Sequence, residues 1–104
     1  MVELVARGAL TDERVKDAFL AVPRETFLPQ VAETEGLESV YRDAAIQTLL
    51  DSRGNSISSS SQPAIMAPML EMLGLEPGMR VLEVGTATGY NAALLSPLVG
   101  PTGT

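Results

Sequence analysis

Apolar residues recur at helical spacing near the start of the chain. Four of them fall at i, i+3, i+4 and i+7 and share one face of a predicted helix: Val15, Ala18, Phe19 and Val22. The Thr11 hydroxyl is placed to cap the free amides of this helix, and Asp12 and Glu13 lie near the positive end of its dipole. Pro23 ends the helix. Residues 23–29, bounded by two prolines, are expected to form an extended anchor rather than a helix.

A second helical pattern comes directly after a run of serines. Pro63 suits the first turn of a helix and Gly74 suits its end. The apolar residues that share one face of this helix are Ile65, Met69, Met72 and Leu73. The methionines at 66, 69 and 72 are expected to pack in the core, and Pro68 is expected to bend the helix or to confine its regular part to the residues after the proline. Residues 56–61 (SISSSS) resemble a flexible linker by composition, but their position also allows them to cap the helix.

The third pattern is a short apolar run before a pair of glycines. Its apolar residues are typical of a buried parallel strand: Val81, Leu82 and Val84. Residues 85–89 (GTATG) form a loop of small residues, and residues 90–97 predict a helix. A strand, a glycine loop and a helix in this order make the first half of a Rossmann-type unit. Earlier in the chain, the pattern allows a short strand at residues 44–50 and a turn at residues 53–55.

The composition limits the chemistry that the chain can perform. Its 104 residues suffice for one small domain, and 45% of them are hydrophobic. The 7 basic and 13 acidic side chains give a formal charge of −6, which disfavours binding to nucleic acid. Cys and His are absent, so thiolate and imidazole catalysis are excluded and no metal site is predicted. Neither a signal-peptide pattern nor a long apolar run is present, which predicts a cytoplasmic protein without a membrane partner.

The glycine loop and the residue before it suggest a binding site. A turn of small residues lets backbone amides approach a ligand, and the free amides at a helix start attract an anion. Glu83 lies at the carboxyl end of the predicted strand, where open parallel sheets bind ligands, and its carboxylate can accept from an ammonium group. This combination fits an amino-acid-like zwitterion better than a pyrophosphate and points to S-adenosylmethionine. A tight structural turn and a solvated charge are the alternatives; a phosphate-binding loop is disfavoured because no Gly-Lys-Ser/Thr comes after the glycines.

The sequence VLEVGTATGY at residues 81–90 resembles the first cofactor motif of class I methyltransferases. Three more stretches resemble protein-L-isoaspartate O-methyltransferases: VPRETFLP at 22–29, the Tyr41-Arg42-Asp43 turn, and the Ser-Gln-Pro segment before a Met- and Leu-rich helix. The resemblance implies an α/β fold, namely the N-terminal portion of a Rossmann-like class I methyltransferase with a helical N-terminal segment and an incomplete sheet. It also implies that the residues holding the methionine end of the cofactor are Glu83, Gly85, Thr86, Ala87 and Gly89.

The resemblance further implies an active-site serine, from the family's Ile-Ser-x-Pro pattern. Matching the pattern from Pro63 selects Ser61, whereas matching it from Ile57 selects Ser58. Ser61 is preferred because the Gln-Pro pair fixes its distance to the next helix. The family's loops usually carry glycine where this chain has Ala87, and the added methyl is harmless only if the backbone there keeps a negative φ and the ligand stays clear.

The function implied by the resemblance is carboxyl methylation in protein repair. The substrate would be a protein or peptide with an L-isoaspartyl or related aspartyl carboxylate, and methyltransferases of ribosomally made peptides are an alternative. Such a carboxylate is already ionised at neutral pH, so no general base is required and the serine would position it by hydrogen bonding. Orientation and exclusion of water would then accelerate the transfer.

The chain is expected to divide at residue 55. Residues 1–55 would form a helical and extended segment on the substrate side, and residues 56–104 would begin the S-adenosylmethionine-binding domain. That domain is expected to be truncated and inactive alone, because each further crossover unit takes about 30 residues. The non-enzymatic alternative is an association module that pairs with another copy through an exposed edge at residues 81–84. Titration with S-adenosylmethionine distinguishes the cofactor-binding domain from the association module.

Overall fold

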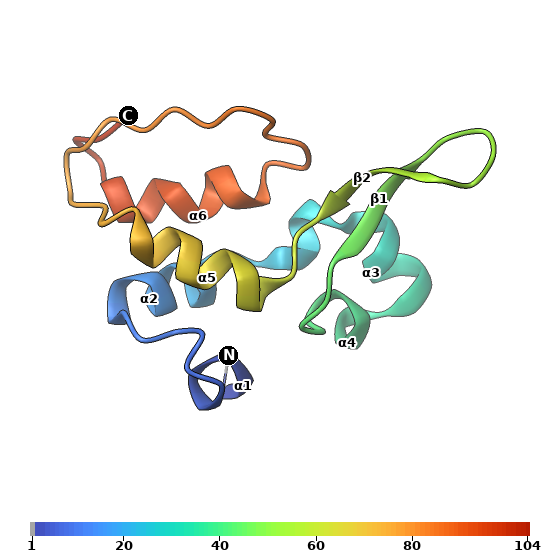
Figure 1. Cartoon of the computed structure of the whole chain (residues 1–104), viewed down its shortest axis with the longest axis horizontal. Helices are drawn as coiled ribbons and strands as arrows, with labels where there is room; N and C mark the ends of the chain where they lie inside the picture. The colour runs from blue at the N-terminus through green and yellow to red at the C-terminus, as the bar shows by residue number, and fades with distance from the viewer. Residues whose placement is uncertain (1) are drawn as a thin grey trace.

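The computed structural model describes residues 2–104, which form short helices, one small sheet and long connecting segments (Figure 1). In chain order the elements are α1 (Val2–Ala6), α2 (Glu13–Ala21), the 3₁₀ helix η1 (Arg24–Phe27), α3 (Pro29–Glu35), α4 (Leu37–Val40), β1 (Ile46–Leu50), β2 (Ser56–Ser60), α5 (Pro63–Met72) and α6 (Tyr90–Val99). None of the helices in this part of the chain is long and apolar enough to cross a membrane.

The core lies where α2 packs against both α5 and α6 (Figure 1). Its buried side chains include Val15, Ala18, Phe19, Met66, Leu70, Leu94 and Leu98. The rings of Phe19 and Tyr90 meet edge to face with their centroids 6.5 Å apart, a favourable arrangement for aromatic pairs. The apolar face predicted for the first long helix is therefore confirmed.

The start of α2 differs from the prediction. Asp12, not Thr11, is the N-cap residue, and its Oδ1 accepts from the amides of Arg14 at 2.8 Å and Val15 at 3.4 Å. The Thr11 hydroxyl instead donates to Glu71 Oε2 at 2.9 Å, while the Thr11 amide donates to the other oxygen of that carboxylate. Thr11 is thus used to join the start of α2 to α5, because a distant carboxylate satisfies both of its donors.

The segment between the two prolines is helical, so the prediction of an extended anchor is wrong. η1 is closed by hydrogen bonds from the Thr26 amide to the Pro23 carbonyl and from the Leu28 amide to the Glu25 carbonyl, both 3.2 Å long. Pro29 then occupies the first turn of α3, where a proline costs no hydrogen bond. The tight turn places the side chain of Arg24 inside the molecule, where it is only 1% exposed.

A β-hairpin extends away from the helices (Figure 1). β1 and β2 pair antiparallel, and the Asp51 carboxylate closes the turn by accepting from the amides of Arg53 and Asn55, each at 2.8 Å. The short strand and the turn predicted for this region are confirmed. The serines, however, are neither a linker nor caps: residues 56–60 form β2, and α5 has no side-chain cap. The division predicted at residue 55 falls in the hairpin and stays a prediction.

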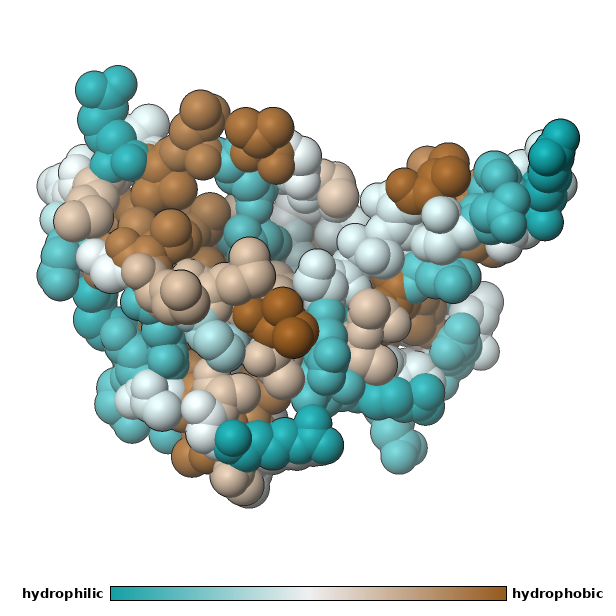
Figure 2. All heavy atoms as spheres, viewed as in Figure 1, coloured by the Kyte–Doolittle hydropathy of each residue, from teal (hydrophilic) through white to brown (hydrophobic). Residues whose placement is uncertain are grey.

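α5 buries a different face from the one predicted. Its buried residues are Pro63, Met66, Ala67 and Leu70. The predicted stripe faces outward, with Ile65 56%, Met69 60% and Met72 86% exposed. Figure 2 shows apolar side chains gathered over α5 and over the segment that leads into α6. Of the three methionines expected in the core, only Met66 is buried there. The reason is that α2 packs against the side of α5 that lies opposite the predicted stripe.

The segment predicted as a buried strand is not one. Within the described residues the only sheet is the β1–β2 hairpin, and residues 81–84 form no ladder. The Val81 amide donates to the Thr104 carbonyl at 2.7 Å, but Leu82 and Val84 are each 88% exposed. A parallel strand is buried by strands beside it and helices on both faces, and among the described residues no strand pairs with residues 81–84. The helix after the loop, α6, continues to Val99, beyond its predicted end near Pro97.

Candidate functional site

One cavity joins the serine segment, residues 56–61, to the glycine loop, residues 85–89. Its volume is about 720 Å³, and its wall is made by residues 59–61, by the outward face of α5, by residues 81–88 and by the start of α6. The apolar wall includes Met69, Met72 and Leu73, three of the four residues in the predicted stripe that the core does not use. Segments that are far apart in the sequence thus meet around one space large enough for a small molecule.

The glycine loop presents free backbone donors. Gly85 and Gly89 have φ angles of +78° and +88°, which only glycine adopts at no steric cost. The Gly89 amide donates to the Thr86 carbonyl at 2.9 Å and closes the turn. Within residues 2–104, the amides of residues 85–88 donate to no protein oxygen. They are therefore available to a ligand, together with the first amides of α6.

Glu83 carries an unused acceptor beside this loop. Its Oε2 atom accepts from Asn91 Nδ2 at 2.6 Å, so the side chain is held in one orientation. Its Oε1 atom is buried and accepts no hydrogen bond from the described residues. An ammonium group would satisfy this oxygen, and a carboxylate would satisfy the loop amides. Asn91 was not predicted from the sequence; its position in the first turn of the helix after the loop is the signal that could have indicated it.

The two candidate serines occupy different places. Ser61 is exposed and lines the cavity, whereas Ser58 lies in β2, pairs with Leu49 and is not part of the cavity wall. The structure therefore brings Ser61 to the same cavity as four of the five predicted cofactor-binding residues, and the fifth, Gly89, closes the loop through its bond to the Thr86 carbonyl. The catalytic role of Ser61 and the cofactor contacts stay predictions.

Ala87 does not keep the negative φ angle under which its added methyl group would be harmless. Its φ angle is +49°, in the left-handed region that costs an alanine about 1 kcal/mol relative to glycine. The loop geometry imposes this angle, since glycines with positive φ lie on both sides of it.

Ala87→Gly is expected to raise the free energy of unfolding by roughly 0.5–1 kcal/mol, because it removes the left-handed strain. The matched control is Ala93→Gly in the regular part of α6, which is expected to lower it by about 1 kcal/mol. Urea unfolding followed by circular dichroism measures both. A destabilisation of equal size in the two variants would contradict the strain at Ala87.

Arg24 and Tyr90 form a buried pair next to the cavity. The guanidinium carbon of Arg24 lies 5.6 Å from the centre of the Tyr90 ring, within reach of a cation–π interaction. Burial lowers the pKa of Arg24, against the opposing influence of Tyr90 and Asp43. Burial also raises the pKa of Tyr90 to about 12 from its ordinary value of 10.0. Neither residue was singled out from the sequence, since a lone Arg or Tyr carries no periodic signal.

The titration of Tyr90 predicts a loss of stability at high pH. Its pKa is higher in the folded chain than the ordinary 10.0, so the folded state holds the proton that the unfolded state releases. The stabilisation is complete below pH 10 and is lost between about pH 10 and pH 12, with a total of roughly 2–3 kcal/mol. Unfolding measured across this range should show a shallower decline for Tyr90→Phe. Parallel declines in the two proteins would contradict the shift.

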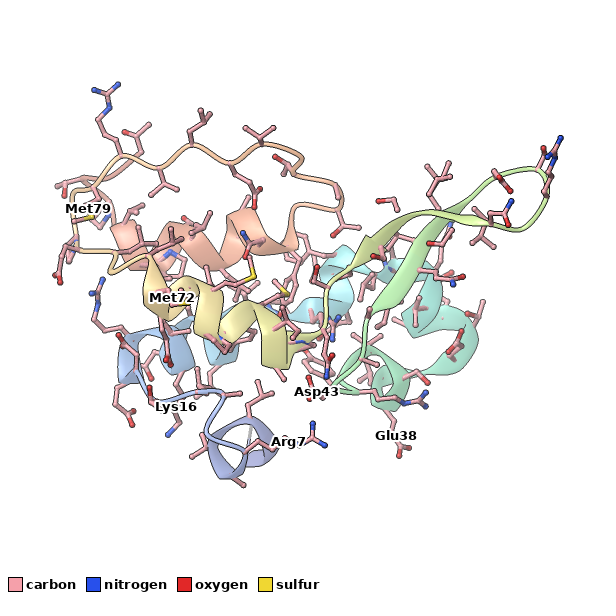
Figure 3. The ribbon with its side chains drawn as sticks, viewed as in Figure 1. Arg7, Lys16, Glu38, Asp43, Met72 and Met79 are labelled. Carbon is pink, nitrogen blue, oxygen red and sulfur yellow. The ribbon has the colours of Figure 1, made fainter. Side chains whose placement is uncertain are left out.

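Asp43 fixes the segment that comes after Ser61. Its carboxylate accepts from the Ala64 amide at 2.9 Å, from Gln62 Nε2 at 3.3 Å and from Arg7 at 2.8 Å. Figure 3 shows Arg7, the residue directly after α1, reaching toward Asp43. The Asp43 side chain is only 7% exposed, so its bonds to Gln62 and Ala64 are made in a partly dry environment and are stronger than exposed ones. The turn that resembles the family thus anchors the first turn of α5.

The fold matches the N-terminal part of a methyltransferase. A solved structure named protein-L-isoaspartate O-methyltransferase matches this chain with a TM-score of 0.77 and 42% identity, covering 96% of this chain and 29% of that one. The family model described as protein-L-isoaspartate(D-aspartate) O-methyltransferase matches residues 1–104. The chain therefore belongs to the protein-L-isoaspartate O-methyltransferase family, whose members use S-adenosylmethionine as methyl donor.

Relatives with the name protein-L-isoaspartate O-methyltransferase come from bacteria and archaea. The Thermotoga maritima protein is 45% identical over 91 residues, which is 88% of this chain and 27% of the relative. The Methanothermobacter thermautotrophicus protein is 39% identical over 101 residues, or 97% of this chain and 42% of the relative. The Methylorubrum extorquens protein is 46% identical over 94 residues, which is 90% of this chain and 36% of the relative. The chain thus spans less than half the length of these relatives.

Proposed function

We propose that the protein to which this chain belongs methylates the carboxylate of L-isoaspartyl residues in proteins or peptides. The observation that carries the proposal is that one cavity is lined by Ser61, by Glu83 with its unused acceptor, and by the loop with the free amides. The family membership and the names of the relatives support it. A cytoplasmic location is part of the same proposal and is tested by cell fractionation.

The residues around the cavity have separable tasks. Glu83 Oε1 and the amides of residues 85–88 would hold the amino and carboxyl groups of the methionine end of S-adenosylmethionine. When bound, this cofactor supplies an electrophilic methyl group. The Ser61 hydroxyl would donate to the substrate carboxylate and orient it, and the apolar wall of α5 would exclude water. No proton has to be removed, which suits a chain without His or Cys.

The proposal is tested in two proteins. The first is the 104-residue chain itself, titrated with S-adenosylmethionine by calorimetry. The second is a hybrid enzyme, which carries residues 1–104 of this chain in place of the matching part of the Thermotoga maritima relative. Methyl transfer to an isoaspartyl peptide, and none to the aspartyl peptide of the same sequence, supports the proposed substrate. Transfer to the aspartyl peptide alone would favour the alternative acceptors, such as ribosomally made peptides.

A second candidate function is association with another copy of the chain. It is favoured by the exposed apolar side chains of Leu82 and Val84 in a segment without a ladder. Sedimentation of the chain over a range of concentrations measures it. Concentration-dependent oligomers without heat of cofactor binding would favour association over catalysis.

A further inference from the structure

The side chain of Arg24 donates hydrogen bonds to the residues around the serine segment. Its Nη2 atom donates to the Ser61 carbonyl at 3.2 Å and to Ser60 Oγ at 3.5 Å. The same guanidinium donates to the carbonyls of Arg42 at 3.3 Å and Ala44 at 3.5 Å. η1 therefore holds the end of β2 and the turn before β1 through one side chain.

Arg24 also contacts the other side of the cavity through Tyr90. Tyr90 is the first residue of α6, directly after Gly89, and its ring centre lies 5.6 Å from the Arg24 guanidinium carbon. The rings of Phe19 and Phe27 pack against Tyr90 at 6.5 and 5.8 Å, so the ring has little freedom to move. One buried cation thus connects the backbone of Ser61 to the end of the glycine loop.

We propose that Arg24 is a positioning residue for methyl transfer, which fixes the backbone of Ser61 at a set distance from the cofactor-binding loop. This inference rests on the proposed function and adds a residue to it. A planar guanidinium can donate to several acceptors at once while its face contacts a ring, whereas a lysine ammonium is a single point of charge. Arg24 does not line the cavity, so its effect would pass through Ser61.

The test compares Arg24→Lys with Arg14→Lys in the hybrid enzyme. Arg14 is a matched control, because it also joins elements through carbonyls, those of Leu75 at 2.6 Å and Leu98 at 2.7 Å, but away from the cavity. Calorimetry counts the sites that bind S-adenosylmethionine, and kcat is expressed per binding site, which removes the effect of unfolded protein. Arg24→Lys is expected to lower this kcat by roughly 10- to 100-fold with unchanged cofactor affinity. Arg14→Lys should lower the melting temperature and leave kcat per site unchanged.

A milder variant covers the case in which Arg24→Lys does not fold. Ser60→Ala removes one acceptor of Arg24 and buries no unpaired charge, and it is expected to lower kcat per site by a few-fold with the melting temperature nearly unchanged. Unchanged kcat per site in the folded variants, or an equal loss in Arg14→Lys, would overturn the positioning role. Absence of methyl transfer in the unmodified hybrid enzyme would instead contradict the proposed function.

Discussion

Replacing Glu83 by glutamine is expected to weaken the binding of S-adenosylmethionine by about 10- to 100-fold. The buried Oε1 atom has no partner among the described residues, and a charged hydrogen bond to the cofactor's ammonium group would contribute roughly 1.5–3 kcal/mol. Glutamine keeps the shape of the side chain and an oxygen that can accept from Asn91. A loss of cofactor affinity in this variant therefore reflects the missing charge and not a collapsed loop.

Calorimetric titration of the hybrid enzyme measures this effect. Glu76→Gln is the matched control, since it changes the net charge equally at an exposed glutamate outside the cavity wall. Its cofactor affinity should equal that of the unmodified protein. Similar losses in both variants would mean that the overall charge acts on binding, and the role of Glu83 in the cradle would be wrong.

Replacing Ser61 by alanine is expected to lower the turnover of the hybrid enzyme by roughly 10- to 100-fold, with little change in cofactor affinity. The exposed hydroxyl lies on the cavity wall and is free to orient a carboxylate, but it is not part of the loop that would hold the cofactor. Steady-state kinetics with an isoaspartyl peptide gives the turnover, and calorimetry gives the affinity.

Ser58→Ala is the control for this experiment and also tests the other match to the family pattern. Ser58 pairs with Leu49 in the hairpin and lies outside the cavity wall, so its replacement should leave turnover unchanged. A loss in Ser58→Ala with normal turnover in Ser61→Ala would reverse the assignment. Equal loss of turnover and cofactor affinity in Ser61→Ala would assign the serine to cofactor binding instead.

The sequence predicted the features that depend on local spacing. The face of α2 and the hairpin turn could be recognised because each arises from residues within a few positions of one another. The position of the glycine loop and of Glu83 relative to it is likewise local. The cavity needed the structure, since it depends on where the serine segment and the loop lie in space.

The predictions that were wrong depend on distant contacts. Residues 24–27 form a 3₁₀ helix that buries Arg24, and the carbonyls that accept from Arg24 lie 18 to 37 positions away along the chain. The serines became a strand because β1 pairs with them, although serine has no strong preference for strands. α5 is apolar on nearly all sides, so periodicity alone could not select which face the neighbouring helices cover.

The tip and the base of the hairpin differ in their relation to the cavity. Its turn at residues 51–55 is closed by Asp51 and lies outside the wall of the cavity, whereas the last residues of β2 lead directly into that wall. Insertions at the turn would be accommodated in solvent, while a single residue added between Ser60 and Pro63 would shift the whole register of the site. Insertions at the tip of the hairpin are therefore expected to be tolerated, whereas insertions at its base are expected to impair the site.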